Sequence, residues 1–259
     1  MSWSEHVIII TGAAQGQGLA HARALAERGA TVIATDFDSE RGQREVDQIA
    51  ASGGSIVFRE LDVSKADQWE ELATWADETY GKVTGLVNNA GISMPGNVLE
   101  TTEEVWNTVL GVNQLGPFLG MRTMAPLIAR SGGGSIVNTA STLGKFASPA
   151  SFAYQATKGA VRMMTKSAAL ALAPHKIRVN TVLPGLVDTE FIARHKETGA
   201  LDSSLSRIAL GRIGEPQEIS AAVVFLLSDE ASYVTGAEII VDGGLIAGST
   251  GSLLPRQDS

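Results

Sequence analysis

The sequence predicts one α/β domain in which a seven-stranded parallel sheet is wound on both faces by helices. Seven short runs, rich in β-branched residues, read as continuous apolar stretches, as strands covered on both faces do. Longer segments with helical periodicity separate these runs, and such alternation is typical of a parallel, doubly wound sheet. No linker, repeat or shift in composition interrupts it, so a single domain is expected over residues 1–259.

Each element follows from its local pattern. The predicted strands span residues 7–11, 31–36, 55–63, 85–89, 135–140, 178–183 and 238–242. The predicted helices lie between them, at residues 18–28, 40–51, 65–80, 103–129, 151–173 and 216–228. Three successive glycines at 132–134 fit a turn from helix to strand. The polar tail at 248–259 suggests no function.

Composition narrows the function classes. A net charge of −8 makes nucleic acid an unfavourable partner, and no basic membrane-binding face is evident. The absence of cysteine excludes disulfides and thiolate catalysis and fits a reducing compartment. The N-terminus lacks a basic region and no apolar run approaches membrane-spanning length, so a cytoplasmic protein is expected. The histidines, at 6, 21, 175 and 195, are scattered, so no metal site is expected.

A glycine-rich turn, Thr11-Gly-Ala-Ala-Gln-Gly-Gln-Gly18, joins the first predicted strand to the first helix. Gly12, Gly16 and Gly18 permit a tight turn, close approach of the backbone to a pyrophosphate, and close packing of helix on strand. The amide groups at the helix N-terminus then face the phosphates. In this strand–turn–helix context, the turn predicts a Rossmann-type dinucleotide site.

Asp36 ends the second predicted strand, where a carboxylate accepts hydrogen bonds from the adenosine ribose and repels a 2′-phosphate. No Arg or Lys lies at 13–17 or 37–40 to neutralise such a phosphate, so the sequence favours NAD over NADP. The alternative for Asp36 is a strand-end cap. Asp62 and Val63 follow the third strand and are expected at the adenine amino group, with helix capping by Asp62 as the alternative.

Tyr154 and Lys158 stand four residues apart in a predicted helix and therefore share one face. A phenol titrates near pH 10, and an adjacent ammonium favours the phenolate and lowers that pKa. Lowering it to about 7 takes roughly 4 kcal/mol. Such a tyrosine can exchange a proton with an alcohol or ketone oxygen. Alone, the pair reads as an ordinary amphipathic spacing; beside a dinucleotide site, the catalytic interpretation is favoured.

With these residues assembled, the sequence over 7–244 resembles the short-chain dehydrogenase/reductase family. At Gln17 the sequence departs from the family, which most often carries an apolar residue between the last two glycines. With its Gly-Gln-Gly variant, the turn resembles that of NAD-dependent hydroxysteroid and cyclic-alcohol dehydrogenases in the family. The resemblance is carried by the turn at 11–18, Asp62, Asn88-Asn89-Ala90-Gly91, Asn113, Ser141, Tyr154, Lys158 and Pro184-Gly185.

The resemblance implies four catalytic residues. Ser141 would hold the substrate oxygen at Tyr154, and Tyr154 would act as general base in alcohol oxidation and general acid in ketone reduction. Lys158 would bind the nicotinamide ribose and lower the pKa of Tyr154. Asn113 would hold a water that relays protons between Lys158 and solvent; the alternative is a helix-interior residue bonded to backbone.

The resemblance also implies the cofactor-binding residues. The loop after the sixth strand would fix the nicotinamide carboxamide for transfer of the pro-S hydride, although a plain Pro-Gly turn is the alternative. Asn89 could otherwise be a strand-end turn residue. The implied set is Gly12, Gln15, Gly16, Gln17, Gly18, Asp36, Phe37, Asp62, Val63, Asn89, Ala90, Gly91, Tyr154, Lys158, Pro184, Gly185, Val187 and Thr189.

The substrate side is expected to be apolar, which suggests a hydrophobic secondary alcohol or ketone, including cyclic and steroidal ones. Residues 189–210 are expected to form a lid, because the family usually has one there. The resemblance implies a homotetramer, in keeping with a second apolar stripe on helices 103–129 and 151–173. The candidate substrate residues are Met94, Leu143, Phe146, Phe152, Leu186, Phe191 and Ile192.

Two other functions remain open from the sequence. A 3-oxoacyl thioester (acyl carrier protein) reductase is the alternative enzyme, and Asp36 disfavours it because reductive biosynthesis in this family usually uses NADPH. A catalytically silent NAD-binding sensor is the alternative from another class. It predicts loss of catalytic residues, whereas Ser141, Tyr154 and Lys158 are all present.

Overall fold

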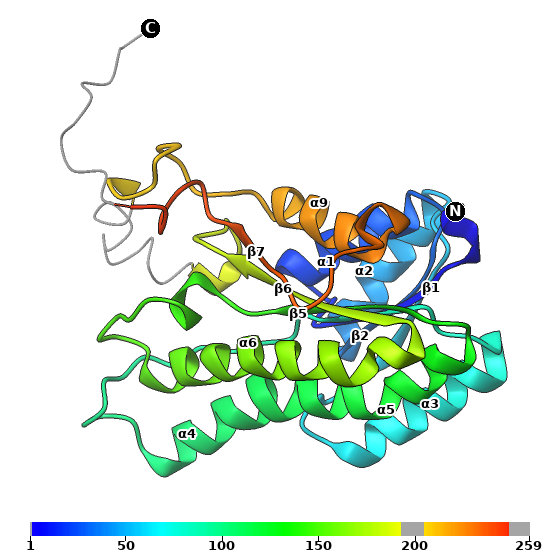
Figure 1. The fold of residues 1–259 in the computed structure, drawn as a ribbon, viewed down its shortest axis with the longest axis horizontal. Coiled ribbons are helices and arrows are strands. Elements are labelled where there is room, and N and C mark those ends of the chain that lie inside the picture. Colours follow the sequence, from blue (N-terminus) through cyan, green and yellow to red (C-terminus); the bar gives the residue numbers. More distant parts are fainter. Residues whose placement is uncertain (1, 193–204, 249–259) are drawn as a thin grey trace, which may run out of the picture.

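The computed structural model describes residues 2–192 and 205–248, and these form a seven-stranded sheet with parallel pairing throughout. The strand order is β3-β2-β1-β4-β5-β6-β7, so the predicted Rossmann-like, doubly wound fold is confirmed (Figure 1). The strands are β1 Val7–Thr11, β2 Thr31–Asp36, β3 Ile56–Glu60, β4 Gly85–Asn88, β5 Gly134–Thr139, β6 Ile177–Pro184 and β7 Glu238–Val241.

Helices cover both faces of the sheet (Figure 1). One face carries α1 Gly16–Ala26, α2 Ser39–Ala51 and α9 Pro216–Leu227, and the other carries α3 Ala66–Tyr80, α4 Glu103–Leu110, α5 Gly116–Arg130 and α6 Phe152–Leu172. Within the described ranges, no helix has the length and apolar character needed to cross a membrane. Short helical turns are η1 Trp3–Glu5, η2 Gly111–Leu115, η3 Thr142–Gly144, η4 Ala173–His175, η5 Glu190–Ile192 and η6 Asp229–Ala231.

The central strand β1 shows why the chain folds in layers. Ile8 and Ile10 point to the face covered by α1, α2 and α9, whereas Val7 and Ile9 point to the face covered by α3 and α5. The three isoleucines are fully buried. Since burying such a side chain stabilises the fold by about 1.5–3 kcal/mol, a strand that is apolar on both sides favours a sheet covered twice.

The strand register brings the carboxyl ends of several strands to one edge of the sheet. Thr11 lies beside Thr35, Asn88 beside Asn138, and Pro184 beside Val241. The strand order reverses between β1 and β4, where ligands bind in open sheets of this kind. Loops that follow these strands therefore meet at one place.

The prediction of a single helix over 103–129 is wrong, because the π-helical segment η2 separates α4 from α5. The Gly116 N–H donates to the Gly111 carbonyl, five residues back. Pro117 has no N–H and cannot donate to the carbonyl of Asn113, four residues earlier, as an α-helix requires. The wider turn accommodates this break and places Asn113 in it.

Several other boundaries differ from the sequence prediction by one to three residues, and two of them have a clear local cause. β3 ends at Glu60 rather than at 63, because the Asp62 carboxylate accepts a hydrogen bond from the Ser64 N–H at 2.9 Å and turns the chain out of the sheet. The first helix begins at Gly16 rather than at 18, since Gly16 has a φ of +56° and lets the chain turn directly into α1.

Candidate active site

The glycine-rich turn between β1 and α1 is shaped by contacts that only glycine permits. Gly12 has a φ of +66°, and a Cβ there would lie 2.8 Å from the Ala90 Cα. A Cβ on Gly18 would overlap the Gly12 carbonyl oxygen. The Gln15 side chain does not cap α1, so no side chain of the N-cap residue occupies the first amide groups of this helix. A turn of this shape fits the pyrophosphate of a dinucleotide.

Asn89 and Ala90 lie directly against this turn. The Thr11 hydroxyl accepts hydrogen bonds from the N–H groups of both residues at 3.0 Å. The Asn89 amide donates to the carbonyls of Thr11 at 3.1 Å and Gly12 at 3.3 Å. Asn89 therefore ties the end of β4 to the end of β1, and it sets the turn's position through backbone groups.

Asp36 is held at the end of β2 by two backbone amides. Its Oδ2 accepts from the Ala14 N–H at 3.0 Å, and its Oδ1 accepts from the Asp38 N–H at 3.2 Å. The side chain is buried, and Phe37 beside it is 76% exposed. The carboxylate is thus fixed next to the glycine-rich turn, where the sequence analysis placed the adenosine ribose.

Arg41 is a neighbour of this region that the sequence analysis missed. Its guanidinium donates to Gln15 Oε1 at 2.6 Å and pairs with both oxygens of Glu190 at 3.0 and 2.7 Å. Pairing with Glu190 raises the pKa of Arg41. Arg41 lies one position beyond the stretch 37–40, and its partner Glu190 lies 149 positions away in the sequence, so no local pattern indicated this contact.

Asp62 and Val63 lie after β3, as expected, but their described bonds are local. Asp62 Oδ1 accepts from the Ser64 N–H at 2.9 Å and the Ser64 hydroxyl at 2.7 Å. These bonds form a turn ahead of α3 and are not the expected helix cap, because the N-cap residue of α3 is Lys65 and no side chain caps this helix. The Val63 carbonyl accepts from Trp69 Nε1 at 3.0 Å. Contact of these residues with adenine stays a prediction.

Ser141, Tyr154 and Lys158 meet at the same edge of the sheet. Ser141 follows β5 and starts η3, whereas Tyr154 and Lys158 share one face of α6. The Ser141 hydroxyl is hydrogen-bonded to the Tyr154 phenol. Lys158 Nζ lies 5.6 Å from the Tyr154 ring centroid and donates to the Thr139 carbonyl at 2.7 Å. All three residues are buried.

Burial displaces the titration of both ionisable groups. It raises the pKa of Tyr154 to about 12, although the hydrogen bond to Ser141 acts in the opposite direction. Burial also lowers the pKa of Lys158 to about 8. The Tyr154 pKa is therefore raised in the structure and not lowered as expected, and the part that the Lys158 charge plays in it stays a prediction. The physical reason is desolvation, which opposes the phenolate more strongly than the nearby groups favour it.

The side chain of Asn113 is committed to protein contacts. Its Oδ1 accepts from the Ile92 N–H at 2.8 Å, and its Nδ2 donates to the Ile92 carbonyl at 2.8 Å and to Thr157 Oγ1 at 3.3 Å. A Cβ on Gly91 would lie 3.4 Å from both Asn113 Oδ1 and Lys158 Nζ, so these groups adjoin. A water relay at Asn113 stays a prediction. The Asn113 atom suited to bind the water is the backbone carbonyl oxygen, because Pro117 has no N–H to donate to it.

The loop after β6 closes the other side of the glycine-rich turn. The Gly185 N–H donates to the Val241 carbonyl at 3.0 Å, and the Thr189 hydroxyl donates to the Val187 carbonyl at 3.4 Å. The Thr189 methyl lies 3.4 Å from where a Cβ on Gly16 would be. Of the expected lid at 189–210, residues 193–204, His195 among them, lie outside the described residues, as does most of the tail.

Comparisons with known proteins agree with this geometry. A family profile described as "Enoyl-(Acyl carrier protein) reductase" matches residues 12–246. The crystal structure of a short-chain type dehydrogenase/reductase from Mycobacterium marinum superposes with a TM-score of 0.89 at 34% sequence identity, covering 94% of this chain and 96% of that one. The chain belongs to the short-chain dehydrogenase/reductase family.

Three curated relatives with similar sequence identity to this chain are named for different substrates. The 2,5-dichloro-2,5-cyclohexadiene-1,4-diol dehydrogenase of Sphingobium indicum is 40% identical over 93% of this chain and 96% of its own length. The cyclopentanol dehydrogenase of Comamonas testosteroni is 39% identical over 94% and 98%. The 3-oxoacyl-(acyl-carrier-protein) reductase of Thermotoga maritima is 40% identical over 93% and 97%. The family is one of oxidoreductases that bind a nicotinamide dinucleotide.

Apolar side chains surround the tyrosine of this short-chain dehydrogenase/reductase. Met94 and Leu143 belong to the same packed cluster as Tyr154, and the Phe191 ring lies 5.8 Å from the tyrosine ring, centroid to centroid. The other expected substrate residues are placed differently: Phe152 packs on Trp106, Phe146 lies under the Arg207 guanidinium, Ile192 is buried, and the Leu186 carbonyl accepts from the Gly214 N–H.

Five apolar residues of this cluster were missed from the sequence: Ile92, Val105, Trp106, Val109 and Ala153. The spacing of Val105, Trp106 and Val109 along α4 marks an apolar helical face, which is the signal that could have found these three. Nothing local, however, showed that this face would turn toward Tyr154 rather than toward the sheet.

Proposed function

We propose that this protein is an NAD-dependent oxidoreductase that transfers a hydride between nicotinamide and a hydrophobic secondary alcohol or ketone. The observation that carries the proposal is the hydrogen-bonded pair of Ser141 and Tyr154, with Lys158 on the same helix face. This group lies at the sheet edge that also holds the glycine-rich turn. Tyr154 is the proposed general acid and base.

The proton chemistry follows from the described groups. A bound nicotinamide dinucleotide supplies the hydride acceptor or donor. Because the pKa of Tyr154 is about 12, the phenol is protonated at neutral pH and suited to donate a proton to a ketone oxygen. Lys158, with a pKa of about 8, is mostly protonated at pH 7, and its charge favours the phenolate needed for alcohol oxidation. Ser141 holds the reacting oxygen at the phenol.

The shape of the binding half supports NAD as the cofactor. The glycine turn fits a pyrophosphate, and the Asp36 carboxylate is fixed where it would accept from ribose hydroxyls and repel a 2′-phosphate. Arg41, the cation beside Gln15, is paired with both oxygens of Glu190 and is therefore charge-compensated. Asn89, Gly91 and Thr189 would line the remainder of the dinucleotide.

The apolar cluster around Tyr154 supports a hydrophobic substrate, and the two relatives named as dehydrogenases of ring alcohols support a cyclic one. Steroidal alcohols belong to the same class. A 3-oxoacyl thioester reductase is the alternative, supported by the Thermotoga maritima relative and disfavoured by Asp36. A silent NAD-binding sensor is disfavoured because Ser141, Tyr154 and Lys158 lie together.

The deciding experiment is reduction of NAD and NADP, followed by absorbance, with a panel of cyclic, aryl and steroidal secondary alcohols. Turnover with NAD and one alcohol class would support the proposal. NADPH-dependent reduction of a 3-oxoacyl thioester, without alcohol oxidation, would favour the alternative enzyme. Tight NAD binding with no turnover on either panel would favour the sensor.

We also propose a homotetramer in the cytoplasm. Apolar side chains stay exposed on α5 and α6, where Phe118, Met163 and Leu170 are 46%, 66% and 80% exposed. Ile240 on β7 and Phe225 on α9 are a second exposed apolar group. Such faces suit subunit packing, and sedimentation equilibrium tests the state. The cysteine-free sequence supports the location, and the net charge of −8 disfavours nucleic-acid partners.

A further inference from the structure

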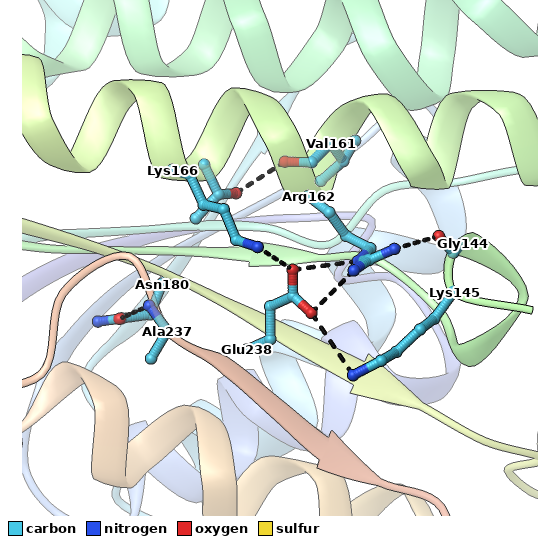
Figure 2. A network of polar contacts seen from close by, with 9 residues as sticks. Gly144, Lys145, Val161, Arg162, Lys166, Asn180, Ala237 and Glu238 are labelled. Carbon is cyan, nitrogen blue, oxygen red and sulfur yellow. Dashed lines mark hydrogen bonds and ion pairs between the residues drawn. The ribbon is translucent and has the colours of Figure 1, made fainter. Parts of the chain in front are cut away.

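Glu238, at the start of β7, receives three cations (Figure 2). Its carboxylate accepts from Arg162 Nη2 at 3.0 Å and Nε at 3.2 Å, and it pairs with Lys166 Nζ at 2.9 Å and with Lys145 Nζ at 4.0 Å. The Glu238 side chain is only 12% exposed and that of Arg162 22%. These bonds hold the pKa of Glu238 below its usual value although burial raises it.

Arg162 makes a second kind of contact, toward the catalytic turn. Its Nη1 donates to the Gly144 carbonyl at 2.5 Å (Figure 2). Gly144 closes the η3 turn that Ser141 begins: the Gly144 N–H donates to the Ser141 carbonyl at 2.9 Å, and the Leu143 N–H donates to Ser141 Oγ at 3.1 Å. Arg162 is therefore bonded to the turn that sets the position of the serine hydroxyl.

The same turn is pressed against the helix that carries the other two catalytic groups. A Cβ on Gly144 would lie 2.7 Å from the Lys158 carbonyl carbon and 3.0 Å from the Gly159 nitrogen. Arg162 follows Lys158 by four residues and Tyr154 by eight, so all three share one face of α6. One side chain thus joins the serine turn, the tyrosine helix and the last strand.

We propose that Arg162, anchored by Glu238, is a positioning residue that holds the Ser141 turn against α6 and so sets the Ser141 hydroxyl at the Tyr154 phenol. This inference rests on the proposed function. A guanidinium suits the task because its planar donors reach a carbonyl and a carboxylate at once. Lys166 binds the same carboxylate from the next turn of α6, farther from Gly144, and therefore provides a matched control.

The test compares Arg162→Met with Lys166→Met in the full-length enzyme. A small displacement of a positioned group can reduce turnover by about 100-fold, so Arg162→Met should lower kcat by roughly 10- to 100-fold with the KM for NAD unchanged. Lys166→Met should keep kcat within about twofold, because an exposed ion pair contributes little. Arg162→Lys should fall between them, since one ammonium cannot reproduce the two-sided contact.

The pH profile separates positioning from a general loss of stability. The Ser141 hydroxyl and the Lys158 ammonium face the phenol, and the hydrogen bond from Ser141 lowers the Tyr154 pKa. Weakening that bond should move the kcat/KM limb for alcohol oxidation to higher pH in Arg162→Met and leave it in place in Lys166→Met. Equal kcat values and equal limbs in the two variants would overturn the proposal.

Hydrogen exchange provides a readout that needs no substrate. The Leu143 and Gly144 amides, which bond to Ser141, should exchange faster in Arg162→Met than in Lys166→Met. Equal exchange rates in the two variants would overturn the positioning role of Arg162, even if the protein showed no activity. Wild-type protein without turnover would instead contradict the proposed function alone. If Arg162→Met does not fold, the same measurements are made on Arg162→Lys. A wild-type kcat together with wild-type exchange rates of the Leu143 and Gly144 amides in that variant would overturn the proposal.

Discussion

The two halves of the sheet edge are built in different ways. In the cofactor half, at the ends of β1 and β2, site groups such as Asp36 and Asn89 are held by backbone hydrogen bonds. In the catalytic half, at β5 and α6, Tyr154 and Lys158 are buried with strongly displaced pKa values. The difference shows that backbone geometry provides position, whereas desolvation provides chemical reactivity.

The largest effect should come from breaking the catalytic half alone. Tyr154→Phe removes the phenol hydroxyl and keeps the ring that packs with Met94 and Leu143. General acid–base catalysis contributes roughly 100- to 10,000-fold, so kcat should fall by about that range. The Kd for NAD, measured by calorimetry, should stay within about twofold because no backbone contact of the cofactor half changes. Near-normal turnover would contradict the assignment of Tyr154.

The converse change should break the cofactor half. In Gly18→Ala, the added methyl overlaps the Gly12 carbonyl oxygen and comes within 2.6 Å of Asn89 Nδ2, so the turn must shift. Overpacking of this kind costs about 1–3 kcal/mol, which predicts a rise in the Kd for NAD of roughly 10- to 100-fold. At saturating NAD, kcat should change little. An unchanged Kd in a folded variant would show that the turn does not contact the dinucleotide.

A change of cofactor preference examines the same half more finely. The double variant Asp36→Ala/Phe37→Arg removes the repelling carboxylate and adds a cation at a position that is exposed in the wild type. Hydrogen bonds to charged groups contribute about 1.5–3 kcal/mol, so the ratio of kcat/KM for NAD over NADP should fall by roughly 10- to 100-fold.

Phe37→Arg alone is the matched control for this change. It keeps the carboxylate, and it should therefore shift the ratio less than the double variant. If the double variant kept the wild-type preference, Asp36 would not be the ribose contact. Tyr154 is untouched in both variants, so kcat with NAD at saturation serves as the internal check on folding and on the catalytic half.

The backbone shape of the cofactor half follows from the sequence more directly than the side-chain surroundings of the catalytic half, and the contrast above explains why. Glycines at fixed spacing after a strand impose one backbone shape, so Gly12 and Gly18 could be interpreted from local pattern. The pKa of Tyr154 depends on how deeply the folded chain buries it, and the expected direction was wrong. The pairing of Arg41 with Glu190 depends on the fold bringing distant segments together.

Some catalytic-half features did have a sequence signal that went unused. Pro117 stands where its missing N–H interrupts the ladder after Asn113, which indicates a wider turn rather than the continuous helix expected over 103–129. By contrast, the contact of Arg162 with Gly144 and Glu238 joins three elements, and helical spacing gave only its face, not its partners. Local rules predict backbone shape, and they leave side-chain pairing across the fold open.

The smallest effect concerns a buried histidine in the helix that follows the glycine-rich turn. His21 on α1 is fully buried, hydrogen-bonded through Nδ1 to Ser220 on α9 at 2.8 Å, and burial lowers its pKa to about 3. An unfolded histidine titrates near 6.5, so this neutral group contributes its stability above that pH and loses it as the pH falls toward 3. Between pH 8 and 5.5 the loss should be about 1.4 kcal/mol.

Urea unfolding of the wild type and His21→Gln at pH 8 and pH 5.5 measures this loss, because glutamine keeps an amide for Ser220 and has no proton to gain. The free energy of unfolding of the wild type should fall by about 1.4 kcal/mol more than that of the variant, since all other groups titrate alike in both. Equal losses of unfolding free energy in the two proteins would mean that His21 is protonated in the native state as readily as in the unfolded state. The expected result would show that the lowered pKa of His21 affects the stability of the fold. The shifted pKa values of Tyr154 and Lys158 would then be the ones linked to the reaction.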